Sequence, residues 1–210
     1  MPRADAARNR SLIVGAAAAE LAEHGLDVSI ARIAARAGVA KGTVFNHFAS
    51  KEDLIAAIFC DQLATLTATG KALLAHPSPR EALHEFIAAG AELQAGDRSL
   101  CEAATATSRD NPMVREASDR LADIAEQLTA RARETGAIRR DITGRDIVLL
   151  LAAPASIATP LASVSPNLWR RYLHLILDAL RPDTAHPLPV AAPTSQDFTA
   201  AADTLEISST

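Results

Sequence analysis

Aromatic side chains are scarce in this sequence. Phe, Tyr and Trp make up 3% of its 210 residues, with a single Trp and a single Tyr. The apolar core must therefore be built mainly from Ala, Leu, Ile and Val. Runs in which β-branched and polar residues alternate are few and Ala is abundant, so the composition favours an all-helical chain.

Cysteine is equally rare. Cys60 and Cys101 lie far apart and have no Cys or His neighbours at the spacing of a metal site, and the six histidines are scattered. We therefore expect structural thiols, no bound metal and no cofactor, while a redox role for Cys101 stays open. A phosphate-binding Gly loop, a nucleophile elbow and a convincing carboxylate pair are also missing, so we do not expect an enzyme.

Charge divides unevenly along the chain. Residues 1–51 hold seven Lys and Arg against four acidic residues, whereas the whole chain has a net charge of −4. The remainder is therefore strongly acidic. A basic N-terminal part on an acidic body is typical of a DNA reader joined to a second domain, and the length suffices for two modest helical domains.

The basic part contains a helix-turn-helix pattern in residues 29–51. Ser29 is a suitable N-cap, apolar residues then recur at helical spacing, and Gly38 ends the first helix. A second helix is expected over residues 40–47, with Val44 and Phe48 buried. Such a second helix is narrow enough to enter the major groove of DNA.

A helical hairpin within a bundle, with a solvated charged face, is the alternative interpretation of this pattern. Two features favour DNA. No carboxylate occurs between Val28 and Lys51, and the residues expected on the outside are Lys, Thr, Asn, His and Lys. All of these side chains can donate to phosphate oxygens or base edges.

The run IARIAARAGVAKGTVFNHFASKEDL resembles the DNA-binding segment of TetR-family transcriptional regulators, including a G-x-x-F-x-x-F core at Gly42, Phe45 and Phe48. The similarity extends upstream to Ile13 and covers about the first quarter of the chain. It implies an all-α fold, in which a three-helix DNA-binding domain precedes a larger helical domain for ligand binding and dimerisation.

The resemblance also implies roles for single residues. Lys41, Gly42 and Phe45 are expected to face base edges, and Thr43, Asn46, His47 and Lys51 to hold phosphates. Ser29 and Arg32 complete the expected DNA-binding set. Ala40, Phe45 and Ala31 depart from residue types common in the family, which leaves the bases that are read undetermined.

The first helix of this domain is expected to end at Gly25, which can adopt the left-handed conformation. Arg residues before SLIVGAAAA also resemble a short signal peptide, but Asp5, Glu20 and Glu23 do not fit one. The helical interpretation places Ile13, Ala17 and Leu21 on one face. We therefore predict a cytoplasmic protein with a DNA-binding domain at residues 1–51.

Residues 52–182 are expected to form the effector-binding and dimerisation domain. Capping boxes at Ser50/Asp53, Ser78/Glu81 and Thr143/Asp146 start three helices, and periodic apolar residues predict another from Pro112 to Gly136. A further helix is expected at about 99–108. Residues 183–210 lack apolar periodicity, so we predict a disordered tail.

Residues 147–169 carry no charge, which invites a transmembrane interpretation. Three prolines and several hydroxyl residues dilute the segment, so two helices, at about 143–158 and 166–180, explain it better. The second has a broad apolar face, which predicts a homodimer interface, although completion of the monomer core is the alternative. The expected interface residues are Leu168, Trp169, Tyr172, Leu173, Ile176, Leu177 and Leu180.

By resemblance, the core of the second domain holds a cavity for a small organic effector. The candidate lining residues are Phe86, Cys101, Thr105, Met113, Leu121 and Leu149, although the pattern favours ordinary core over ligand contact for each of them. The sequence thus predicts a repressor that binds a palindromic operator as a homodimer and is released by a small molecule. A ligand-independent DNA-binding regulator and a helical enzyme containing a similar hairpin are the alternatives.

Overall fold

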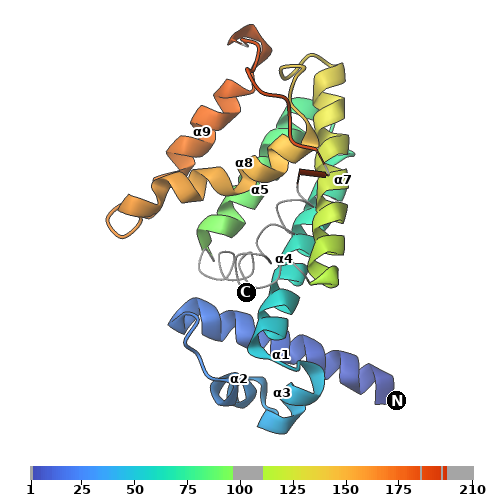
Figure 1. Ribbon diagram of the computed structural model, residues 1–210, viewed down its shortest axis with the longest axis vertical. Coiled ribbons are helices and arrows are strands. Elements are labelled where there is room, and N and C mark those ends of the chain that lie inside the picture. The colour runs from blue at the N-terminus through green and yellow to red at the C-terminus, as the bar shows by residue number, and fades with distance from the viewer. Residues whose placement is uncertain (1, 97–110, 185, 195, 198–210) are drawn as a thin grey trace. The chain divides into compact units, whose positions relative to one another are not determined.

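The described part of the chain is all-helical and contains no strand. The computed structural model describes residues 2–96, 111–184, 186–194 and 196–197 (Figure 1). The helix expected at about 99–108 lies outside these residues. The chain divides into two compact units, Met1–Gln62 with Asp97–Glu116, and Leu63–Gly96 with Ala117–Thr210.

The first unit contains α1 (Pro2–His24), α2 (Ile30–Ala37), α3 (Lys41–His47) and the first part of α4 (Lys51–Leu73). These four helices share one apolar core, and Figure 1 shows them gathered around the start of α4. The core consists of Ile13, Val14, Ala17, Leu21, Val28, Ile33, Ala34, Val44, Phe48, Leu54, Ile55, Ala57 and Ile58. Because few aromatics contribute, the packing depends on aliphatic side chains from every helix.

Local signals set the ends of the short helices α2 and α3. The Ser29 hydroxyl accepts a hydrogen bond from the Arg32 amide at 3.3 Å, which confirms the N-cap. Gly38 adopts the left-handed conformation, with φ of 69°, that ends α2. Ala40 precedes α3 without a side-chain cap, so burial of Val44 and Phe48 must hold this helix in place.

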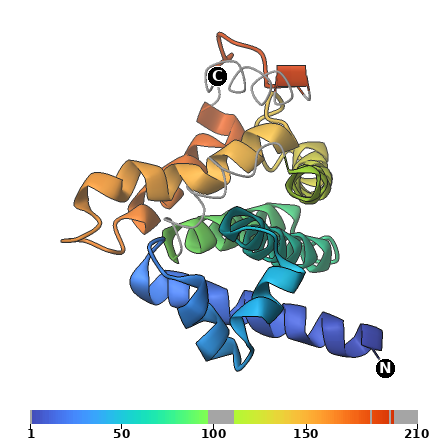
Figure 2. The same cartoon turned by 60° about the horizontal axis from the view of Figure 1, so that its bottom comes forward.

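The second unit contains the rest of α4, α5 (Pro79–Gly96), most of α7 (Pro112–Glu134), α8 (Gly144–Ala158), η1 (Thr159–Leu161), α9 (Trp169–Ala179) and η2 (Pro182–Thr184). Figure 2 shows α8 alongside α9, and both contact α5. Fully buried side chains from several of these elements form the core, among them Phe86, Ile87, Leu128, Ile138 and Ile147.

The start of α8 is fixed by two sets of hydrogen bonds. Thr143 and Asp146 form the expected capping box, in which each side chain accepts from the backbone amide of the other residue. The Gly144 amide also donates to Glu126 Oε2 on α7 at 2.6 Å. A Cβ on Gly144 would lie 2.5 Å from Glu126 Cα. Glycine is therefore needed here for close approach of the two backbones.

The predicted helix at residues 166–180 is observed as α9, which begins at Trp169, three residues later than expected. Residues 166–168 form a turn instead, in which the Leu168 amide donates to the Ser165 carbonyl at 3.1 Å. Pro166 therefore precedes the helix and is not its first residue.

The apolar face of α9 is largely covered within its own unit. Trp169, Leu173, Leu177 and Leu180 are buried, whereas Leu168, Tyr172 and Ile176 are half-buried. The four buried residues pack within their own unit, and their expected role at a dimer interface stays a prediction. The exposed large apolar residues around α8, η1 and α9 are a different set, namely Leu149, Ile157, Leu161, Val164 and Leu175.

One helical stretch of the described chain, Gly144–Leu161, is long and apolar enough to cross a membrane. It corresponds to α8 and η1. Ile147 and Leu151 are buried there, and Pro154 lies inside the helix. About a third of the stretch, 33%, is buried, and length and composition alone are weak evidence for a membrane span.

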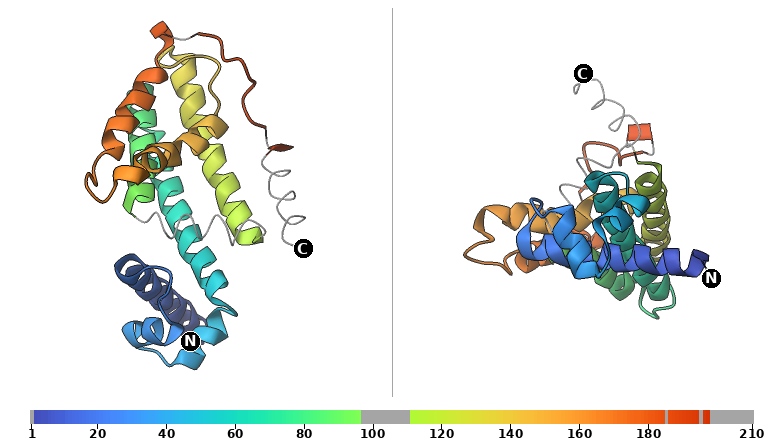
Figure 3. Two further views of the ribbon diagram at one scale, coloured as in Figure 1. Left: turned by 60° about the vertical axis from the view of Figure 1, so that its left-hand side comes forward. Right: turned by 90° about the horizontal axis from the view of Figure 1, so that it is seen from below.

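The predicted tail begins with η2. Arg139 donates to the His186 carbonyl at 2.5 Å and to both carboxylate oxygens of Asp141. Residues 198–210 lie outside the described part, so the predicted disorder of residues 183–210 stays a prediction (Figure 3).

The boundary between the two compact units falls between Gln62 and Leu63, within α4. The sequence suggested a functional division after Lys51, which stays a prediction.

Candidate nucleic-acid interface

Helix α3 presents one polar face outward and one apolar face to the core. Lys41, Gly42, Phe45 and Asn46 are exposed, whereas Val44 is buried. Phe45 is 47% exposed, which is unusual for a large aromatic side chain on such a short helix. The Lys41 amine lies 5.8 Å from the centre of the Phe45 ring. The face therefore combines a cation, an amide and an aromatic ring.

Two further residues of the expected set lie at the margin of this face. Thr43 and His47 are half-buried, and the His47 ring lies 6.4 Å from the Phe48 ring. The Arg10 guanidinium of α1 lies over the same Phe48 ring, 5.2 Å from its centre. Phe48 thus links α1 to the end of α3.

Arg32, expected at the DNA, instead lies in an ion network between α1 and α2. The Arg32 Nε donates to Glu20 Oε2 at 2.5 Å, and the Arg32 Nη2 donates to His24 Nε2 at 2.7 Å. Arg36, one turn later, donates to both Glu20 and Glu23. Arg32 remains half exposed, so its expected contact with DNA stays a prediction and would compete with these bonds.

The network keeps a buried carboxylate charged. Glu20 is 5% exposed. Burial alone would raise the pKa of the Glu20 carboxyl, but hydrogen bonds and charges from Arg36 and Arg32 outweigh it and lower this pKa below its ordinary value of 4.5. The same contacts lower the pKa of Glu23 and raise the pKa of Arg36. The α1–α2 contact is therefore ionic at neutral pH.

Glu20, Glu23 and His24 have ligand atoms within 4.8 Å of one another, a grouping that could hold a metal ion. The carboxylate oxygens, however, already accept hydrogen bonds from Arg32 and Arg36. Two guanidinium groups supply the positive charge that a cation would bring. We therefore assign this cluster to helix packing.

Lys51 is held by the backbone of the same unit. Its amine donates to the Leu26 carbonyl, in the loop between α1 and α2. Lys51 is half-buried and begins α4, where the Asp53 amide donates to the Ser50 hydroxyl at 3.0 Å. The lysine is thus positioned before any ligand arrives, although a phosphate would have to share its donors with the carbonyl.

The expected effector residues differ in burial where the structure describes them. Phe86 and Leu121 are buried, but Met113 and Leu149 are 53% and 54% exposed. Cys101 and Thr105 lie outside the described residues. The expected effector set therefore stays a prediction.

Sequence reasoning missed several residues of this unit. Glu20 and Glu23 had been noted only as acidic residues, yet they face Arg32 and Arg36 across the helix pair. The sequence did carry a signal for these ion pairs, because one helix has two carboxylates three residues apart and the next has two arginines four residues apart. The contacts of Arg10 and Leu26 carried no such signal.

Comparisons with known proteins agree with this geometry. A family model for bacterial regulatory proteins of the tetR family matches residues 13–58, and one for the SbtR-like transcriptional regulator C-terminal domain matches residues 78–182. Among curated proteins, no match was found.

Solved structures resemble the chain over most of its length. The TetR transcriptional regulator SCO0520 from Streptomyces coelicolor is 30% identical, with 84% of this chain and 99% of that chain covered and a TM-score of 0.62. The TetR regulatory protein from Mycobacterium vanbaalenii is 30% identical, covering 86% and 99%, with a TM-score of 0.63. FadR from Bacillus subtilis, solved with stearoyl-CoA, shares the fold at 20% identity, covering 84% and 99%, with a TM-score of 0.63.

A helix-turn-helix unit joined to a larger helical unit defines the class: a DNA-binding transcriptional regulator. The chain belongs to the TetR family of bacterial regulatory proteins. Members of this family regulate transcription and are not enzymes.

Proposed function

We propose that the protein is a ligand-responsive repressor that binds a palindromic operator as a homodimer in the cytoplasm and is released by a small-molecule effector. The observation that carries this proposal is the exposed face of α3. Lys41, Phe45 and Asn46 project from a short helix whose other side is anchored by Val44. A rigid helix with such a face suits the major groove.

The charges around α3 support the same function. Lys51 lies at the start of α4, Thr43 and His47 flank the exposed face, and residues 29–50 contain no carboxylate. We assign base contacts to Lys41, Gly42 and Phe45, and phosphate contacts to Thr43, Asn46, His47 and Lys51. Phosphate contacts would set the position of the protein on the duplex, and contacts to base edges would set its sequence preference.

A homodimer follows from the size of one reading helix, which covers only a few base pairs. The exposed apolar residues Leu149, Ile157, Leu161 and Leu175 supply a surface for a second copy, with the half-buried Tyr172 and Ile176 at its margin. A twofold pair of this kind binds two half-sites related by the same symmetry. The operator is then a palindrome.

Release by an effector is supported by the second unit. FadR from Bacillus subtilis, which shares this fold, was solved with stearoyl-CoA. The second unit of this chain contains an open groove between two of its helices, described below. A ligand that bound one arrangement of the dimer better would shift the population away from the DNA-bound arrangement.

Selection of bound duplexes from random DNA tests the proposal. We expect a palindrome whose half-site centres are about one helical turn, roughly 10 base pairs, or a multiple of it apart. Phe45→Ala should lower affinity for the selected duplex, and Arg140→Gln, which removes an exposed charge from the second unit, should not. No preference for any duplex over bulk competitor at moderate salt would refute DNA-binding regulation, and a selected site with no repeat would refute the dimer.

A further inference from the structure

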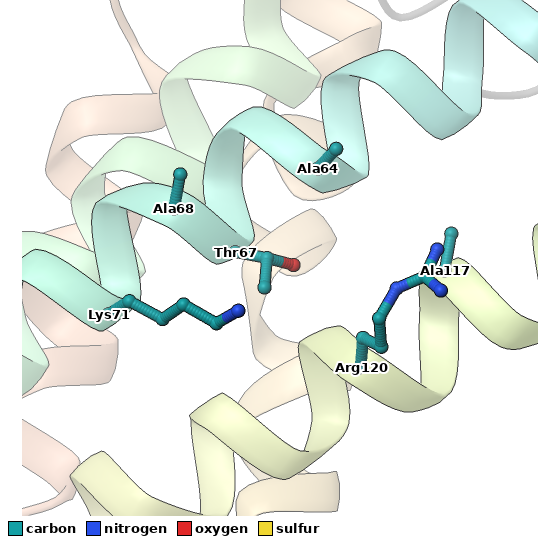
Figure 4. A pocket seen from close by; sticks show the side chains of 6 residues that line it. All are labelled: Ala64, Thr67, Ala68, Lys71, Ala117 and Arg120. Atoms are coloured by element: carbon teal, nitrogen blue, oxygen red, sulfur yellow. The ribbon is translucent and has the colours of Figure 1, made fainter.

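Within the second unit, a groove of about 170 Å³ lies between α4 and α7 (Figure 4). It is lined by Ala64, Thr67, Ala68, Lys71, Ala117 and Arg120. Figure 4 shows the Lys71 and Arg120 side chains, one from each helix, extending toward the space between the helices. None of the four described effector residues expected from the sequence, Phe86, Met113, Leu121 and Leu149, lines this groove.

The lining combines two positive charges with small apolar side chains. Its described lining contains Lys71 and Arg120, both exposed, and no carboxylate, although acidic residues outnumber basic ones in the chain as a whole. Ala64, Ala68 and Ala117 also line the groove. This lining suits an anion with a small apolar part.

Thr67 does not contribute a hydrogen-bond donor for an anion in this groove. Its side chain is buried, and its hydroxyl donates to the Leu63 carbonyl at 2.7 Å. That proton is already used, so Thr67 cannot donate to an anion. Recognition of negative charge depends on the lysine amine, with three donors, and the guanidinium, which can bind a carboxylate through two parallel hydrogen bonds. Arg120 also has an interaction within the chain, with which a ligand would compete.

The volume indicates which ligand the groove can hold. A protein cavity of about 150 Å³ holds a molecule such as benzene. The groove is about 170 Å³ and open to solvent, so a carboxylic acid with a ring or a short chain fits within it.

We propose that the groove between α4 and α7 is the effector site and that it takes a compact organic carboxylate, bound by Lys71 and Arg120 together. The proposal rests on the proposed function as a ligand-responsive regulator. One carboxylate held by both cations joins the two helices. Because α4 continues without interruption from Leu73 back to Lys51, a change at the groove acts on the helix that also begins beside α3.

Calorimetric titration of the full chain tests the site. The probes are benzoate, butyrate and cyclohexanecarboxylate, with benzyl alcohol as a neutral ligand of similar shape and inorganic phosphate as an anion without an apolar part. We expect at least one carboxylate to bind with one site per chain, and its affinity to exceed that of benzyl alcohol and phosphate by about tenfold or more.

Four variants locate the binding. Lys71→Gln and Arg120→Gln should each weaken carboxylate binding by about tenfold, because each removes a charged hydrogen-bond donor. Ala68→Leu should abolish binding by filling the groove while leaving both charges in place. Arg140→Gln is the matched control and should bind as the wild type does. Circular dichroism confirms that each variant is folded.

Three results would overturn the proposal: none of the three carboxylates binds at millimolar concentration, benzyl alcohol binds as tightly as benzoate, or Ala68→Leu and Lys71→Gln both bind as the wild type does. A gel shift with the selected duplex on the same samples separates the two proposals. If the duplex binds and no carboxylate does, only the effector site fails. If a carboxylate binds and no duplex does, the anion site stands and the DNA-binding function fails.

Discussion

The basic side chains of the first unit differ in what holds them in the free protein. Lys41 lies over the Phe45 ring, Lys51 donates to the Leu26 carbonyl, and Arg32 is bound to Glu20. A side chain that is already oriented loses less entropy when DNA binds, but it must also share or exchange its partner. We therefore expect the three cations to contribute unequally to DNA affinity.

The first prediction separates base reading from phosphate binding. Lys51→Ala should weaken binding about equally for all sequences and lower the slope of log affinity against log salt by about 0.9, because one phosphate contact is lost. Lys41→Ala should relax the preference at one base pair. Selection and salt titration with both variants measure this. Unchanged sequence preference in Lys41→Ala would contradict its contact with a base edge.

The second prediction concerns the ion network of Glu20. The pKa of the Glu20 carboxyl is lowered in the folded protein, so its stabilising contribution is present above the ordinary value of 4.5 and is lost as the pH falls through the lowered pKa. Glu20→Gln should therefore lower the Tm at pH 7, and the difference from the wild type should shrink below pH 4.5. Thermal unfolding across this range measures the effect.

Glu85→Gln, at an exposed position on α5, is the control for that measurement. It should change the Tm little at any pH, because an exposed charge without a buried partner adds little to stability. A Tm difference for Glu20→Gln that stayed constant from pH 7 down to pH 3 would show that the network does not depend on the charge of this carboxylate.

At the scale of the helix, the sequence predicted best where a single residue determines an end. Ser29 and Gly38 fix α2, and Thr143 with Asp146 starts α8, because caps depend on a few neighbouring atoms. The start of α9 was missed because Pro166 suits a first helical position and a preceding turn equally well.

The sequence could not decide what covers an apolar face. Periodicity marked Trp169 and Leu173 as one face of a helix, but a face can be buried by the same chain or by a partner, and the structure buries these two within the unit. Leu149 shows the opposite case, because it is apolar yet 54% exposed. Contacts between distant segments decide both cases, and local periodicity carries no information about them.

The third prediction tests close packing of α8 against α7. Gly144→Ala should destabilise the protein by about 1–3 kcal/mol, because the new Cβ would lie 2.5 Å from Glu126 Cα and backbone cannot move aside easily. Gly15→Ala on α1 is the matched control, since nothing lies within 4 Å of its added Cβ. It should stabilise by about 0.5–1 kcal/mol. Denaturant unfolding measures both, and equal effects would refute the packing argument.

At the scale of the whole molecule, the apolar surface of α8 and η1 matters most. Ile157 and Leu161 are each 51% exposed, and Leu175 of α9 is 53% exposed. Large exposed aliphatic side chains on adjacent elements suit a surface that the proposed dimer covers.

The fourth prediction follows for assembly. Ile157→Glu should convert a dimer into a monomer at micromolar concentration, because a charge would be buried at the interface without a partner. Sedimentation velocity measures the mass, and affinity for the selected palindrome should fall with it. Val190→Glu is the control, at a position 77% exposed in the segment after α9. A wild-type protein that is already monomeric would refute the proposed interface.

Helix α4 runs through the boundary between the two compact units, between Gln62 and Leu63. One residue inserted within either part of α4 would rotate the residues that follow by about 100° about the helix axis and turn buried side chains such as Ile58 or Leu66 away from their cores. The number of residues in each part of α4, and not only their identity, is therefore a property that this regulator must keep.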